Sequence, residues 1–122
     1  MIQLVRLCTG LDDEALRELN RSAAVLFLPL REAAANALLE AMSSGLPVVT
    51  TDRPATRESA GDCSVYFEPG SVPQAVSGLA EFLRSDRLRV RLGQACRERA
   101  ARHLWETVAR RHTQLYEGVL DL

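Results

Sequence analysis

Two glutamates with seven residues between them, Glu32 and Glu40, have the types and spacing best suited to chemistry in this chain. Small residues at 33–36 follow Glu32 and lead into the apolar positions of a predicted helix that carries Glu40. A carboxylate accepts two hydroxyl hydrogen bonds, so it suits a sugar diol, and free amides at a helix start attract phosphates. The pattern therefore predicts a site for a nucleotide-bearing ligand at the mouth of an α/β sheet.

The elements before this site are predicted from hydrophobic pattern and capping residues. An apolar segment spans 4–7, and Asp12 is placed as the N-cap of a helix over 13–21. The run 23–28 is apolar without alternation, which is typical of a parallel strand covered on both faces, and Pro29 ends it. The predicted strand therefore ends shortly before the loop that contains Glu32.

The elements after the loop continue the alternation. The next helix has core spacing at Ala35, Leu38, Leu39 and Met42. Gly45 is placed to end this helix, a strand is expected at 48–50, a polar turn at 51–60 and a short strand at 64–67. Strands that alternate with helices in this way predict βαβ units and a parallel sheet.

The second half is predicted to be helical. Ser71 with Gln74 marks one helix start, Ser85 marks a second, and a last helix begins near Leu104. The apolar face expected in the first of these helices consists of Val76, Leu79, Ala80 and Leu83. That of the second consists of Leu88, Leu92, Ala95, Cys96 and Ala100. That of the last consists of Trp105, Val108, His112, Leu115, Val119 and Leu120. We expect one α/β domain over 1–122, Rossmann-like and three-layered, with a small parallel sheet and a helical C-terminal tail.

Composition excludes several classes of function. The net charge is −1, so a nucleic-acid surface is not indicated, and all 15 basic residues are arginine, which excludes Schiff-base and P-loop lysines. Cys8, Cys63 and Cys96 are odd in number and widely spaced, so we interpret them as reduced, mostly buried thiols. No metal site is predicted, and His103 and His112 are interpreted as structural. Without a signal peptide or an apolar run of ~20 residues, a cytoplasmic protein without a transmembrane segment is expected.

Several motifs in order resemble one family. Residues 31–50 match the signature of Glu, seven residues, Glu-Ala-Met, small residues and Gly-x-Pro-Val-Val. This signature is similar to that of the C-terminal half of GT-B-fold, retaining, nucleotide-sugar-dependent glycosyltransferases of group 1. Further matches are Thr9-Gly10-Leu11, Ala23 to Pro29, Arg57-Glu58, Tyr66 to Gly70, and Trp105-Glu106 to Tyr116. The resemblance covers nearly the whole chain.

The resemblance implies roles for the site. Glu32 is implied as the catalytic-site residue that hydrogen-bonds the donor sugar, and Glu40 as the residue that binds the ribose. The amides of Ala33, Ala34, Ala35 and Asn36 are implied to face the sugar and the diphosphate. The donor is a nucleoside-diphosphate sugar, and neither a cofactor nor a metal is implied.

Other interpretations of the same residues stay open. Glutamates on a helix are usually solvated surface residues, and Asn36 also suits a helix cap. Arg31 suits either a phosphate or a surface ion pair. Thr51 and Asp52 suit either a ligand at a strand end or a solvated turn.

The chain also departs from the family pattern. Alanine at 33 or 35 stands where the family usually has glycine, and Pro29-Leu30 replaces Pro-Ser. The family's earlier strands, which would supply an Arg and a Lys to the diphosphate, and its N-terminal acceptor domain have no counterpart in the match. We therefore expect the isolated chain to be inactive without an acceptor domain or a partner subunit. The alternatives are a non-catalytic interaction module that dimerises or docks through its first strand or last helix, and a relative of sugar-nucleotide epimerases.

Overall fold

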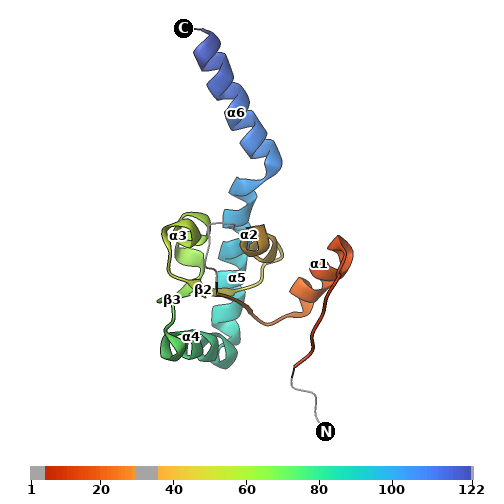
Figure 1. The fold of residues 1–122 in the computed structure, drawn as a ribbon, viewed down its shortest axis with the longest axis vertical. Helices are drawn as coiled ribbons and strands as arrows, with labels where there is room; N and C mark the ends of the chain where they lie inside the picture. Colours follow the sequence, from red (N-terminus) through yellow and green to blue (C-terminus); the bar gives the residue numbers. More distant parts are fainter. Residues whose placement is uncertain (1–4, 30–35, 122) are drawn as a thin grey trace.

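A computed structural model describes residues 5–29 and 36–121 of the chain. Along the sequence it contains α1 (Asp13–Ser22), β1 (Leu26–Leu28), α2 (Asn36–Ser43), β2 (Val48–Thr51), α3 (Pro54–Ala60), the 3-10 helix η1 (Gly61–Cys63), β3 (Val65–Phe67), α4 (Val72–Arg84), α5 (Asp86–Ala100), the 3-10 helix η2 (Ala101–His103) and α6 (Trp105–Leu120). The elements from β1 to η2 form the body of the molecule, α1 lies to one side of it, and α6 projects from it (Figure 1).

The three strands form one parallel sheet in the order β1-β2-β3. All four residues of the central strand β2 are buried. Successive β2 residues face opposite sides, so Val48 packs with α2, α3 and the end of α5, whereas Val49 packs with α4. Helices thus cover both faces of the sheet (Figure 1). This arrangement confirms the predicted Rossmann-like, three-layer α/β fold with a small parallel sheet.

Helix starts follow the local sequence closely. Asp12 accepts a hydrogen bond from the Ala15 amide at 2.8 Å and caps α1, as predicted. Ser85 caps α5 in the same way by accepting from the Leu88 amide at 3.1 Å. Ser71 caps α4, but the Gln74 side chain accepts from the Glu68 amide instead of closing a capping box. These starts are local features, so the sequence alone predicts them.

Three predicted elements differ from the structure. The described residues 5–7 of the apolar segment at 4–7, where the first strand was expected, form no strand and are exposed. The expected polar turn at 51–60 contains helix α3, which Pro54 begins at its first position. Strand β1 is shorter than the predicted 23–28 and is not covered on both faces, since Phe27 is 41% exposed.

The buried face of helix α4 overlaps the predicted face only in part: Leu79 packs against the core and Ala80 is half-buried, as predicted. Its buried residues are Ala75, Gly78 and Phe82, whereas Val76 and Leu83 are 58% and 60% exposed. A Cβ at position 78 would lie 3.0 Å from Val65 and 3.2 Å from Val49, so the absent side chain lets α4 approach the sheet closely. Close packing at glycine selects this face over a stripe of larger apolar residues.

The apolar face predicted to be buried in α6 is exposed. Trp105 is 82% exposed, and no residue of α6 is buried by the described chain. Of the cysteines, Cys96 is buried and Cys63 is half-buried as expected, but Cys8 is exposed, because the segment around it packs against nothing. No helix among the described residues has the length and hydrophobicity needed to cross a membrane.

Candidate functional site

The carboxyl ends of the three parallel strands lie at one edge of the sheet, where ligands bind in open α/β folds. Strand β1 ends at Leu28, and α2 begins at Asn36. Arg31, Glu32 and Ala33 to Ala35 come between them in the sequence and lie outside the described residues. Their predicted roles remain predictions, whereas Asn36 and Glu40 belong to the described part of α2.

Asn36 and Glu40 lie on the same side of α2. They are four residues apart, which places them one above the other on a helix, and both are exposed. The opposite side of the helix holds Leu38, Ala41 and Met42 in the core. In the described part of the chain, the Glu40 carboxylate makes no hydrogen bond or ion pair. Its carboxylate is therefore an exposed acceptor on the surface of α2.

Glu40 also lines a cleft of about 530 Å³ between three helices. The lining residues are Asp13, Leu16, Arg17, Asn20 and Arg21 of α1, Glu40 and Ser43 of α2 with the adjacent Ser44, and Arg97 of α5. Arg97 donates to the Ser44 carbonyl at 3.2 Å and so ties α5 to the end of α2. The cleft combines arginines, hydroxyls and carboxylates, and it lies beside the second half of α2, whereas the carboxyl edge of the sheet lies at the start of that helix.

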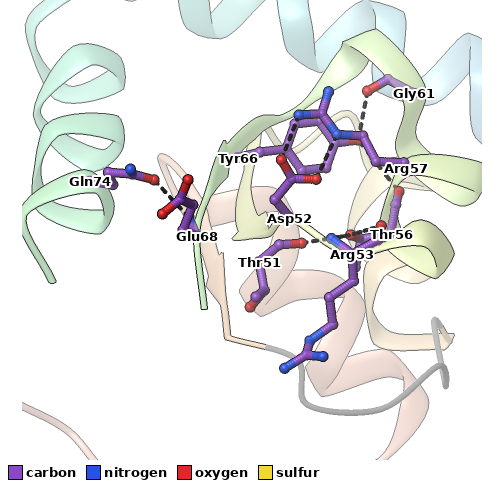
Figure 2. A network of polar contacts seen from close by, with 9 residues as sticks. All are labelled: Thr51, Asp52, Arg53, Thr56, Arg57, Gly61, Tyr66, Glu68 and Gln74. Atoms are coloured by element: carbon purple, nitrogen blue, oxygen red, sulfur yellow. Dashed lines mark hydrogen bonds and ion pairs between the residues drawn. The ribbon is translucent and has the colours of Figure 1, made fainter. Parts of the chain in front are cut away.

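A second polar cluster lies just beyond the end of β2 (Figure 2). Asp52 and Arg57 form a two-pronged ion pair with distances of 2.8 and 2.9 Å. The Arg57 guanidinium lies 3.8 Å from the centre of the Tyr66 ring, and the Tyr66 hydroxyl donates to the Gly61 carbonyl at 2.6 Å. The cluster therefore joins β2, α3 and β3 and holds Asp52 at the sheet edge.

Thr56 stabilises the same turn from inside. Its hydroxyl is buried, donates to the Thr51 carbonyl at 2.6 Å and accepts from the Arg53 amide at 3.1 Å. Thr51 is buried at the end of β2, whereas Asp52 is exposed, so the turn after the strand is ordered by polar contacts. The burial of Thr51 does not fit a solvated turn, whereas a ligand role for the exposed Asp52 stays a prediction.

The electrostatics of the cluster follow from these contacts. The hydrogen bonds from Arg57 hold the pKa of Asp52 below its usual range, and the same bonds raise the pKa of Arg57. Burial raises the pKa of Tyr66 to about 12, although Arg57 opposes this shift. At neutral pH the cluster therefore contains a carboxylate, a guanidinium and a neutral phenol.

Sequence reasoning did not find this cluster as a unit. Asp52 and Arg57 were visible as polar residues after a strand, but Tyr66 lies in the next strand, and only the β2–β3 register brings it alongside. Among residues 5–29 and 36–121, no group of three His, Cys, Asp or Glu side chains could hold a metal ion. His103 of η2 contacts the Arg99 carbonyl of α5 at 3.3 Å, and His112 contacts the Val108 carbonyl of its own helix α6 at 2.9 Å.

Comparison with known sequences gives a consistent result. Residues 4–99 match the family described as group 1 glycosyl transferases. The chain is 34% identical to an MMP alpha-(1->4)-mannosyltransferase of Mycolicibacterium hassiacum, over 96% of this chain and 30% of that protein. It is 32% identical to a phosphatidyl-myo-inositol mannosyltransferase of Mycobacterium leprae, over 98% of this chain and 33% of that protein. The chain thus spans about a third of the length of these curated relatives.

Proposed function

Because this chain belongs to the group 1 glycosyl transferase family, we propose that it is the part of a retaining glycosyltransferase that binds the nucleotide-sugar donor. The observation that carries the proposal is the position of Glu40. Its carboxylate is exposed, stands one helical turn from Asn36, and has no polar partner in the described chain. Such a group suits the two hydroxyls of a ribose, which is the role that the family signature implies for it.

The remaining roles in this proposal rest on the resemblance and on helix physics. Glu32 hydrogen-bonds the donor sugar, and the amides of Ala33, Ala34, Ala35 and Asn36 face the sugar and the diphosphate. The start of α2 lies after the carboxyl end of β1, where free amides and the helix dipole favour an anion. In glycosyl transfer the leaving group is the nucleoside diphosphate. Amide N–H groups that are fixed in this position therefore stabilise the negative charge that develops on the diphosphate.

The relatives suggest the substrate class. Both are mannosyltransferases by name, so a nucleoside-diphosphate mannose is the donor that we propose. We propose that the acceptor binds outside this chain, which spans about a third of the length of the matched relatives. We therefore expect donor binding by this chain without sugar transfer.

Calorimetric titration tests this proposal. The purified chain is titrated with GDP-mannose, UDP-glucose and ADP-glucose, in the wild type and in the Glu40→Gln variant. Losing hydrogen bonds to a charged acceptor weakens binding by about 1.5–3 kcal/mol, so we expect a loss of affinity of roughly 10- to 150-fold. Glu81→Gln is the matched control, since Glu81 is also an exposed helical glutamate but lies on α4.

Three results would contradict the proposal. The first is no binding of any donor by a folded wild-type chain. The second is equal loss of affinity in Glu40→Gln and Glu81→Gln, which would indicate a general charge effect. The third is equal binding of the wild type and Glu40→Gln, which would place the ribose elsewhere.

A further inference from the structure

Two arginines follow the central strand β2 at the carboxyl edge of the sheet, and their surroundings differ. Arg57 donates to both carboxylate oxygens of Asp52, at 2.8 and 2.9 Å, and its guanidinium lies over the Tyr66 ring. Arg53 is half-buried, and its side chain runs away from the Asp52–Arg57 pair (Figure 2). Arg53 is therefore a second cation at this edge, separate from the ion pair.

The backbone of Arg53 is held firmly at the end of β2. Its amide donates to the Thr56 hydroxyl at 3.1 Å, and its carbonyl accepts from the Arg57 amide at 2.9 Å. Thr56 in turn donates to the Thr51 carbonyl at 2.6 Å. Pro54 comes next, and a residue before proline favours extended backbone, which agrees with the φ of −141° and ψ of 155° at Arg53. The side chain thus extends from a fixed point.

This fixed point lies at the same edge and over the same face of the sheet as the start of α2. Helix α2 follows β1 and helix α3 follows β2, and because these strands are parallel, both helices begin at the carboxyl edge. Leu38 of α2 and Ala60 of α3 belong to one core cluster, so the two helices cover the same face. Thr50 donates to the carbonyl of Leu28, the last residue of β1, and the three residues from Thr50 to Arg53 span at most about 11 Å.

We propose that the Arg53 guanidinium binds the diphosphate of the nucleotide-sugar donor. This inference rests on the proposed function, which places the diphosphate at the start of α2. A guanidinium presents a planar fork of N–H donors that matches two phosphate oxygens. All 15 basic residues of the chain are arginine, so a guanidinium is the permanent side-chain cation that this chain is able to offer.

The acidic groups at this edge are compatible with the assignment. The two-pronged ion pair with Arg57 compensates the Asp52 carboxylate. Glu68 follows β3, which lies on the other side of β2 from β1. Figure 2 shows Glu68 beside Gln74 and apart from Arg53. Neither carboxylate therefore repels a diphosphate from Arg53.

Calorimetric titration of the 122-residue chain with two probes, GDP-mannose and inorganic pyrophosphate, tests the assignment. Arg53→Gln removes charge-assisted hydrogen bonds to phosphate, so it should weaken the binding of both probes, that of GDP-mannose by roughly 10- to 150-fold. Arg53→Lys keeps the charge but loses the fork, so it should retain part of the affinity. Glu40→Gln should weaken the binding of GDP-mannose but not that of pyrophosphate, which has no ribose.

Arg91→Gln is the matched control. Arg91 is exposed in the middle of α5, and its replacement changes the net charge by the same amount as Arg53→Gln does. It should leave the binding of both probes unchanged. The backbone hydrogen bonds of Arg53 do not involve its side chain, so thermal unfolding of Arg53→Gln should match that of the wild type and show that the turn is intact.

The contrary results separate this assignment from the proposed function. GDP-mannose binding that Glu40→Gln weakens and Arg53→Gln does not would overturn the role of Arg53 and leave the donor site standing. Pyrophosphate binding that depends on Arg53, without binding of any nucleotide sugar, would support the anion site and contradict the proposed function. Equal losses in Arg53→Gln and Arg91→Gln would indicate a general charge effect and overturn the assignment. A folded wild-type chain that binds neither probe would overturn both.

Discussion

The contact between α5 and the turn after α2 should be sensitive to one methyl group. Gly93 of α5 lies against Gly45, whose φ of +72° ends α2. A Cβ added at position 93 would lie 2.2 Å from the Gly45 carbonyl oxygen. The two backbones must separate by roughly 0.8 Å to reach the 3.0 Å below which Cβ contacts essentially never occur. Gly93→Ala therefore changes the packing of the helix that carries Glu40.

The magnitude follows from two opposing effects. Overpacking of a core contact costs about 1–3 kcal/mol, and a clash with backbone belongs at the upper end, because a backbone cannot rotate away. Alanine in a helix interior recovers about 1 kcal/mol relative to glycine. We expect Gly93→Ala to lower the free energy of unfolding by about 2 kcal/mol and the Tm by roughly 6–10 °C.

Thermal unfolding followed by circular dichroism measures this effect, with two other glycines as references. Gly78→Ala meets only valine methyl groups at 3.0 and 3.2 Å, so a smaller loss is expected. Gly118→Ala meets nothing within 4 Å and should increase helix content. A Gly93→Ala protein that unfolds at the wild-type temperature or above would refute the reasoning, because the close approach of α5 to Gly45 would then be absent.

Two further predictions concern ionisable groups. Asp52→Asn should lower the Tm at neutral pH. Because hydrogen bonds from Arg57 lower the pKa of Asp52, the difference from the wild type should be complete above the ordinary carboxyl pKa of about 4 and should shrink as the pH falls further, through the lowered pKa of the folded protein; a difference that stays constant into strong acid would contradict the ion-pair explanation. A thiol reagent should modify the exposed Cys8 first and the half-buried Cys63 more slowly. It should modify Cys96 only on unfolding, because burial raises the pKa of this thiol to about 12. Rapid labelling of all three cysteines in the folded protein would contradict the packing of α5.

Local signals in the sequence predicted much of the fold. The caps at Asp12, Ser71 and Ser85 are hydrogen bonds to amides three residues away, so neighbouring residues suffice to identify them. The apolar run at 48–50 and the short strand before Glu68 became adjacent parallel strands. The position of Asn36 and Glu40 on the same side of α2 also follows from helical spacing alone.

The errors share a physical cause. Helix α4 has two apolar stripes, and the choice between them depends on how closely Gly78 approaches Val49 and Val65, which belong to two different strands. The apolar face of α6 matches the pattern of a buried helix, yet the described chain provides nothing to bury it. Periodicity identifies a face that is able to pack, but the opposing surface decides whether it does.

The amino-acid sequence by itself determined the family, the parallel α/β architecture and the helix that carries Glu40, because these depend on motifs, periodicity and caps within short stretches. Only the tertiary structure decided which faces are buried and which polar groups meet. The Asp52–Arg57–Tyr66 cluster requires the register of β2 against β3, and the cleft beside Glu40 requires α1, α2 and α5 to converge. Contacts between residues far apart in the chain depend on the geometry of packing, which local patterns do not encode.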